Sequence, residues 1–178
     1  REGVVGQPIA VNPIVSANPT DGDVGALLYG SLGDLLDGYR AETQGRSYLL
    51  TLKQDLRWDN GQPLTSDDVV FTIKTVQDPD ARSPLAESWE GVAAERVSEL
   101  KVRLALPAPY AFLPAAFERL PIIPRHVWGA IPPSNFRFSA YNLEPVGSGP
   151  YRFDSFARRR DGFITEYRLV RSDAYRGP

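Results

Sequence analysis

Cysteine and methionine are absent from the 178-residue sequence, and His126 is its one histidine. The lack of cysteine excludes disulfides, thiolate metal sites and cysteine nucleophiles. A histidine metal site or a catalytic triad needs partners that a lone histidine does not have. We therefore expect neither a metal nor a cofactor, and we interpret His126 as a hydrogen-bonded residue at the start of a short helix after Pro124.

The sequence also lacks an excess of either charge and any long apolar run. Its 20 basic and 22 acidic residues give a formal net charge of −2, so the composition offers no basic footprint for nucleic acid. The densest basic run, 158–160, is followed at once by Asp161 and is interpreted as a solvated turn. No apolar run approaches the roughly 20 residues of a membrane helix, and we expect no direct membrane insertion of this chain.

What is present is an ordinary globular composition with interleaved short strands and helices. The chain length predicts one domain or a tight pair of lobes. Strands and helices do not alternate regularly, which favours an α+β fold with a mainly antiparallel sheet and short packed helices. The expected strands are 2–11, 47–52, 92–97 and 101–106, together with the hairpin strands 151–156 and 163–170.

The clearest helix is expected directly after Thr65. Thr65 is a suitable cap, and Asp67 and Asp68 lie in the first turn, where negative charge meets the positive helix end. Apolar residues at helical spacing follow until Asp78-Pro79 ends the helix. Other helices are expected from Thr20 or Asp21 towards Leu32, within 107–118 and after Pro124, with polar connections at 34–46 and 130–148.

Two further features are consistent with a structural role. The run Gly147-Ser148-Gly149-Pro150 is neither a phosphate loop, which needs Gly-Lys-Ser/Thr opening a helix, nor a nucleophile elbow, and is interpreted as the approach to a strand. The tryptophans and tyrosines could line a ligand cleft, but aromatic side chains more often fill cores, where each buries about 150–250 Å².

Several motifs occur in an order that is typical of one receptor family. Residues 57–72 read Arg-Trp-Asp-Asn-Gly-Gln-Pro-Leu-Thr-Ser-Asp-Asp-Val-Val-Phe-Thr, beside the family's Trp-Ser-Asp-Gly-x-Pro-Leu-Thr-Ala-Asp-Asp-Val-Val-Phe-Ser/Thr. Residues 122–127 are similar to its Ile-Val-Pro-Lys-His-Val, and residues 145–153 to its Pro-Val-Gly-Thr-Gly-Pro-Tyr-Lys-Phe. Over essentially its whole length the chain resembles the oligopeptide-, dipeptide- and nickel-binding receptors of bacterial ABC importers, the extracellular solute-binding proteins of family 5.

This resemblance implies a fold and a domain organisation. The fold expected is a periplasmic-binding-protein type II lobe with an inserted domain. Residues 1–28 and 146–178 would form parts of the first ligand lobe, and residues 29–145 the inserted extra domain. The second lobe of the family is absent from this chain, which is therefore expected to be an N-terminal fragment.

The resemblance also implies a function, which is non-covalent binding and not catalysis. Such a receptor captures a peptide or a related small solute between two lobes that close by hinge motion, and then docks on an ABC permease at the membrane. The expected location is periplasmic or extracellular, with an anchor through a removed N-terminal lipoprotein leader left open. Receptors for uptake and for sensing fit the sequence equally well.

The ligand-binding residues implied by the resemblance lie in two loops. In peptide-binding members, contacts come from the loop after the Asn-Pro-like motif and from a tyrosine that follows a Ser-Pro pair. The corresponding positions here are Ala17, Asn18 and Pro19, and Leu85. Ala17 replaces an acidic residue that meets a basic peptide group, and Leu85 lacks the tyrosine hydroxyl, so both departures argue against an oligopeptide ligand of the best-studied type.

Two alternatives of other classes stay open at this point. The first is a carboxylate-based hydrolase built on Asp67 with Glu118 or Asp59, which needs a convergent pair in one cleft with a raised pKa. Asp67 and Asp68 are helix neighbours that point about 100° apart, so they do not flank one substrate bond. The second is a protein-interaction module formed by residues 29–145, which an exposed apolar patch above several hundred Å² would favour.

Overall fold

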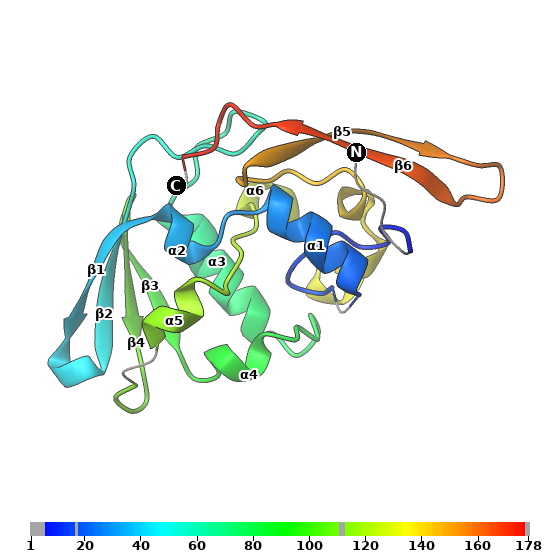
Figure 1. The fold of residues 1–178 in the computed structure, drawn as a ribbon. Helices are drawn as coiled ribbons and strands as arrows, with labels where there is room; N and C mark the ends of the chain where they lie inside the picture. Colours follow the sequence, from blue (N-terminus) through cyan, green and yellow to red (C-terminus); the bar gives the residue numbers. More distant parts are fainter. Residues whose placement is uncertain (1–5, 17, 111–112, 177–178) are drawn as a thin grey trace.

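The computed structural model describes residues 6–16, 18–110 and 113–176. Figure 1 shows a sheet with helices packed on it towards one end and a long two-stranded hairpin beside a helix towards the other. The helices are α1 (Pro19–Leu28), α2 (Leu32–Leu35), α3 (Ser66–Gln77), α4 (Ala86–Trp89), α5 (Leu113–Phe117) and α6 (Arg125–Trp128), with 3-10 turns η1 (Thr43–Gly45), η2 (Pro133–Phe138) and η3 (Ala140–Asn142). The strands are β1 (Leu36–Glu42), β2 (Ser47–Leu52), β3 (Ala93–Ser98), β4 (Lys101–Ala105), β5 (Tyr151–Arg158) and β6 (Ile164–Arg171).

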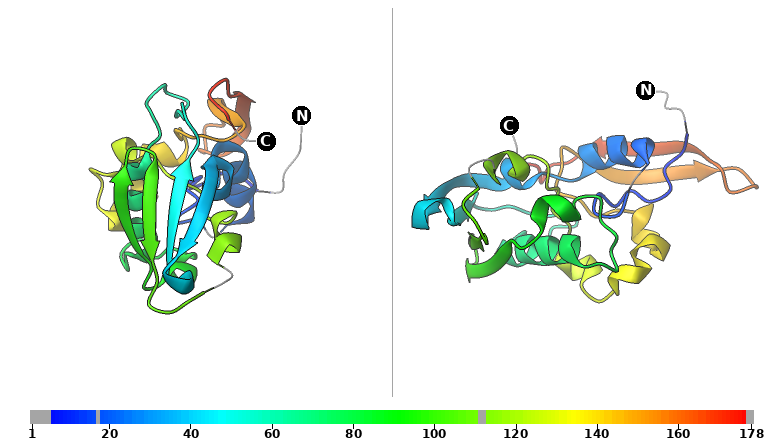
Figure 2. Two further views of the ribbon diagram at one scale, coloured as in Figure 1. Left: turned by 90° about the vertical axis from the view of Figure 1, so that its left-hand side faces the viewer. Right: turned by 90° about the horizontal axis from the view of Figure 1, so that it is seen from below.

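The larger sheet has the strand order β1-β2-β4-β3, and every pair in it is antiparallel. The four strands lie side by side in the left view of Figure 2. In the register of β2 and β4, Tyr48 lies opposite Leu104 and Leu50 opposite Val102. All four side chains are buried, because alternate residues of a strand point to one face. The predicted α+β class with mainly antiparallel pairing is thus confirmed.

Helix α3 packs against β3 and β4 and carries the predicted signals. Thr65 and Asp68 form a capping box, in which the Asp68 carboxylate accepts the Thr65 N–H at 2.9 Å. Val69, Ile73 and Val76 are fully buried, and the helix ends at Asp78 before Pro79. The local sequence was sufficient to predict α3, because the cap residues and the apolar face indicate the same residue range.

The predicted core role is confirmed for the three tryptophans, whereas Tyr110, Tyr141 and Tyr151 are exposed. Trp58, Trp89, Trp128, Phe117 and Phe136 are among the largest fully buried side chains. Trp128 and Phe136 lie 4.8 Å apart between ring centroids, which joins α6 to the η2 segment. The predicted connector 130–148 is therefore well packed at Phe136, although it contains only short 3-10 turns.

The prediction of a polar loop over residues 34–46 was wrong for much of its length. Residues Leu36–Glu42 form strand β1, which pairs with β2 so that Tyr39 lies opposite Leu50. Strand β1 is an edge strand that is mostly exposed, so it lacks the apolar alternation by which strands are recognised. Pairing with β2, and not its own composition, makes it a strand.

The expectations for the N-terminal segment also need correction. Residues 6–11, the described part of the predicted strand 2–11, are not in a strand. The Asp21 carboxylate accepts the N–H groups of Ile9 and Ala10, at 2.7 and 3.0 Å, and so replaces a neighbouring strand as their partner. Helix α1 ends at Leu28, and Leu32 belongs to the separate helix α2, which Ser31 caps.

The hairpin of β5 and β6 is confirmed and projects beyond the rest of the fold in Figure 1 and in the right view of Figure 2. Phe153, Phe156 and Tyr167 form a small aromatic cluster on it, with Phe156 and Tyr167 stacked at 6.4 Å. Gly162 has φ +88° in the turn, a conformation that glycine adopts without strain. Helix α1 contacts β5, so the hairpin is held to the body at its base.

Candidate functional site

Asn18 and Pro19, two of the predicted ligand-binding residues, lie at the start of α1. Pro19 is exposed in the first helical position, where its missing N–H is not needed. The Asn18 side chain accepts the Thr20 N–H at 2.9 Å and donates to the Asp21 carboxylate at 3.1 Å. The oxygen and one N–H of this amide are therefore already used at the start of α1. Ala17 lies outside the described residues.

Leu85 lies in a different segment, directly before α4. Its backbone N–H donates to Ser83 Oγ at 3.3 Å, and its side chain is half-buried and packs against the core. The loop that contains it extends towards the α1 side of the molecule in Figure 1. Asn18 and Pro19 are thus adjacent, whereas Leu85 comes from the segment after α3 and provides an apolar side chain.

The three carboxylates of the hydrolase alternative have separate environments. Asp67 is partly exposed and pairs with Arg96 at 3.4 Å and Arg125 at 3.9 Å. The Asp59 carboxylate accepts the Gly147 N–H at 3.0 Å, and the exposed Glu118 carboxylate lies against Gly33. Each of the three carboxylates thus lies against partners of its own, and no hydrogen bond joins any two of them among the described residues.

Among the described residues, Asp59 and Asp68 are the carboxyl groups whose pKa is raised by burial. Burial raises the pKa of Asp68, against the opposing hydrogen bonds from the backbone N–H groups of Thr65 and Arg125. Burial likewise raises the pKa of Asp59, against the Gly147 N–H and the positive charge of Arg152. Each of these two carboxylates accepts backbone N–H groups, which gives it a structural role in holding separate segments together.

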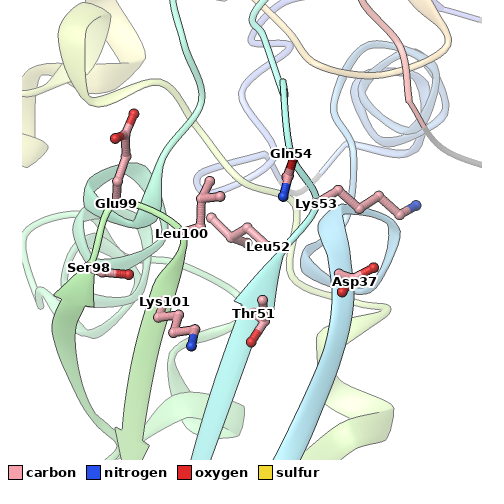
Figure 3. A pocket seen from close by; sticks show the side chains of 9 residues that line it. All are labelled: Asp37, Thr51, Leu52, Lys53, Gln54, Ser98, Glu99, Leu100 and Lys101. Atoms are coloured by element: carbon pink, nitrogen blue, oxygen red, sulfur yellow. The ribbon is translucent and has the colours of Figure 1, made fainter.

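The described residues border two hollows on the surface, neither of which the sequence predicts. The larger, about 620 Å³, lies at one end of the four-stranded sheet and is bordered by Asp37, Lys53, Glu99 and Lys101 (Figure 3). Lys53 Nζ is already bonded to the Asp34 carbonyl at 2.7 Å and to the Arg176 carbonyl at 3.2 Å. The rim of the hollow thus carries carboxylate and ammonium groups, and charged side chains of both kinds are common on a solvated surface.

The smaller hollow, about 330 Å³, lies beside α1. Small residues of α1 form one side, and residues before α2 and after α5 form the other; they include Gly22, Gly25, Ser31, Glu118 and Arg119. In residues 6–16, 18–110 and 113–176 no group of three or more His, Asp or Glu side chains could hold a metal ion. His126 Nε2 lies 2.9 Å from Asn60 Nδ2, so the expected hydrogen bond of this histidine is present.

None of the described helices is both long enough and apolar enough to cross a membrane. The helix at Pro19–Leu28 has ten residues and the one at Ser66–Gln77 has twelve, whereas about 20 apolar residues are needed for a span. The described residues therefore contain no candidate for a membrane-spanning helix.

Comparisons with known proteins identify the family of the chain. The sequence model described as "Bacterial extracellular solute-binding proteins, family 5 Middle" matches residues 32–178. The oligopeptide-binding protein AppA of Bacillus subtilis is 25% identical over 164 residues, which are 85% of this chain and 30% of AppA. The chain thus spans about a third of the length of this curated relative.

Solved structures show the same fold. The substrate-binding protein CtaP of Listeria monocytogenes superposes with a TM-score of 0.78 at 26% identity, over 90% of this chain and 36% of CtaP. AppA of Bacillus subtilis, solved in complex with a nonapeptide, superposes with a TM-score of 0.83 at 24% identity, over 97% of this chain and 36% of AppA. The fold is therefore that of the type II periplasmic binding proteins, and the chain belongs to the bacterial extracellular solute-binding proteins of family 5.

Proposed function

We propose that this chain is part of the substrate-binding component of an ABC importer and captures a peptide or a related small solute by non-covalent binding. The observation that carries this proposal is the family match over residues 32–178. The resemblance to AppA, named as oligopeptide-binding, and to CtaP, named as an ABC transporter substrate-binding protein, supports it. On the basis of the same membership we propose binding outside the membrane and delivery to a permease.

The proposed domain organisation keeps residues 1–28 and 146–178 in the first ligand lobe and 29–145 in an inserted domain. Two features support it. The four-stranded sheet lies entirely within 29–145, whereas the hairpin lies within 146–178 and contacts α1. The chain segments also meet at the proposed boundary, where the Gly149 N–H donates to the Leu28 carbonyl at 2.8 Å. We propose that a second lobe outside residues 1–178 completes the binding cleft.

Within this arrangement we propose that Ala17, Asn18, Pro19 and Leu85 face the ligand. Pro19 and Leu85 provide apolar surface, and Asn18 provides backbone groups because its side chain caps α1. No catalytic residue is assigned, because Asp67 is paired with arginines and Asp59 is held by Gly147. We further propose a location outside the cytoplasmic membrane, with an anchor through a removed lipoprotein leader.

A thermal-shift screen tests the proposal. The receptor that contains this chain together with the second lobe is screened with peptide, nickel-chelate and sugar panels. A ligand present at 100 times its dissociation constant stabilises the protein by about 2.7 kcal/mol. The 178-residue chain alone is the matched control, and we expect no shift for it because half of the cleft is missing.

Three outcomes would contradict the proposal. The first is a full shift with the 178-residue chain alone, which would show that the second lobe is not needed. The second is turnover of a panel compound, followed by mass spectrometry, which would favour the hydrolase alternative. The third is the absence of any shift with the complete receptor across all panels.

A further inference from the structure

Three segments that are far apart in sequence meet at the boundary between the two proposed domains. Gly147 and Asp59 form a reciprocal pair, in which the Gly147 N–H donates to Asp59 Oδ2 at 3.0 Å and the Asp59 N–H donates to the Gly147 carbonyl at 2.9 Å. On the other side of the same run, Gly149 N–H donates to the Leu28 carbonyl at 2.8 Å. The run 147–149 therefore lies between the turn at Asp59 and the end of α1.

The approach is close enough to require glycine. A Cβ atom at Gly147 would lie 1.9 Å from the Leu28 carbonyl oxygen, and one at Gly149 would lie 2.6 Å from the Leu27 carbonyl oxygen. Both obstacles are backbone atoms, which do not move aside as a side chain does. Ser148, buried between the two glycines, accepts the Gly30 N–H on its hydroxyl at 3.2 Å. This gives the Gly147-Ser148-Gly149 run a packing role in place of the catalytic ones excluded earlier.

Asp59 is unusual in this joint because it brings a carboxylate into it. The groups that face it include the N–H groups of Gly147 and Asn60, the Arg152 side chain on β5, His126 on α6 and the Tyr29 hydroxyl at the end of α1. Burial raises its pKa, so the charged form is disfavoured at this position. The reciprocal bonds with Gly147 nevertheless hold this carboxylate between two segments that are 88 residues apart.

We propose that Asp59 is a positioning residue that fixes the four-stranded sheet and its helices relative to α1 and the hairpin, and thereby sets the spacing between Leu85 and Pro19. It acts without touching the ligand. Pro19 begins α1, whose last turn is bonded to Gly149, whereas Leu85 follows α3 on the Asp59 side of the joint. This inference rests on the proposed function, because it assigns Leu85 and Pro19 to one binding surface.

The chain itself provides a direct test because it contains no cysteine. Spin labels at Asp23→Cys on α1 and Glu95→Cys on β3, both exposed positions, report the distance across the joint by pulsed electron resonance. In D59A, which removes the acceptor for Gly147, we expect a shifted or broadened distance distribution. In D59N, whose amide oxygen still accepts the Gly147 N–H, we expect the parental distribution.

Asp67→Ala is the matched control, since its two ion pairs lie within the sheet domain and do not cross the joint. It should leave the distance unchanged. If D59A lacks native near-ultraviolet circular dichroism, D59E replaces it, because the longer side chain moves the acceptor by one methylene and should shift the distance. Identical distributions in the parental chain and in the folded Asp59 variant would overturn the proposal.

The consequence for binding is measured in the complete receptor with a ligand found in the screen. D59A should weaken the affinity about tenfold, which corresponds to about 1.4 kcal/mol, while D59N and D67A should retain it. Unchanged affinity in D59A despite a shifted distance would also overturn the positioning role. If no ligand is found, the function proposed above fails, while the label distances still decide whether Asp59 fixes the joint.

Discussion

The Asp68 carboxylate accepts a hydrogen bond from the backbone N–H of Arg125, 57 residues away, at 2.9 Å. The same carboxylate closes the capping box with Thr65 at the start of α3. One buried side chain therefore joins the N-terminus of α3 to the first residue of α6.

Replacing Asp68 by alanine should destabilise the fold by about 2–3 kcal/mol, because it removes a helix cap and leaves two partly buried N–H groups without an acceptor. Urea denaturation measures the change. D67A is the control one residue away, and since its ion pairs are partly exposed it should cost at most about 1 kcal/mol. Equal losses in the two variants would contradict the role given to Asp68.

The pH dependence of stability should reveal the raised pKa of Asp59. Its folded-state pKa lies above the unfolded value of about 3.9, so between the two values the folded state binds more protons than the unfolded state. Its contribution is therefore fully present below pH 4 and declines as the pH rises through the folded pKa.

Urea titrations from pH 3.5 to pH 7 test this sign. The difference in the free energy of unfolding between the parental chain and D59N should fall as the pH rises. D37N, which replaces an exposed carboxylate on β1, serves as the control for general charge effects. A difference that grows with pH would mean that Asp59 is stabilised in its charged form.

Gly147→Ala should destabilise the chain by more than about 3 kcal/mol, since the added methyl group would meet the Leu28 carbonyl oxygen at 1.9 Å. Gly22→Ala is the matched control. Gly22 is exposed on α1 and has no atom within 4 Å of an added Cβ, so this variant should gain up to about 1 kcal/mol from helix propensity. Thermal unfolding of both variants gives the comparison.

Ser148→Ala should cost about 1–3 kcal/mol, because it leaves the buried N–H of Gly30 without its acceptor. Ser148→Thr retains the hydroxyl at the same position and should recover most of the loss, in agreement with the threonine of the family motif. Chemical denaturation distinguishes them. A threonine variant as unstable as the alanine variant would show that space, and not the hydrogen bond, decides this position.

Leu85→Tyr tests the proposed binding surface in the complete receptor. The variant restores the hydroxyl of the family motif at a half-buried position, and one added hydrogen bond contributes about 0.5–1.5 kcal/mol. Calorimetric titration with peptides should therefore show a several-fold gain in affinity. Leu85→Phe, which has the ring without the hydroxyl, is the control and should not show that gain.

A helix or strand could be predicted from the sequence where the contacts that determine it are local. Helix α3 was predicted closely because Thr65, Asp68 and Pro79 all lie within or beside it. Strand β1 was missed because its partner β2, and not its own polar composition, makes it a strand.

The candidate site was less accessible to sequence reasoning. Asn18 caps α1, so this helix begins one or two residues before the start at Thr20 or Asp21 that the sequence predicts. The joint was missed because Asp59 and Gly147 are 88 residues apart, and no periodicity or spacing links them. The one available signal was the pair of glycines around Ser148, since paired glycines mark places where two backbones approach closely.

The projecting hairpin has a consequence for handling the chain in concentrated solution. β5 and β6 pair with each other and with no other described strand. The outer edge of each strand therefore carries backbone N–H and C=O groups that have no strand partner. Such edges attract a strand from a second molecule. Light scattering should therefore report self-association that grows with protein concentration and starts at this arm, while the arginines along it moderate the effect.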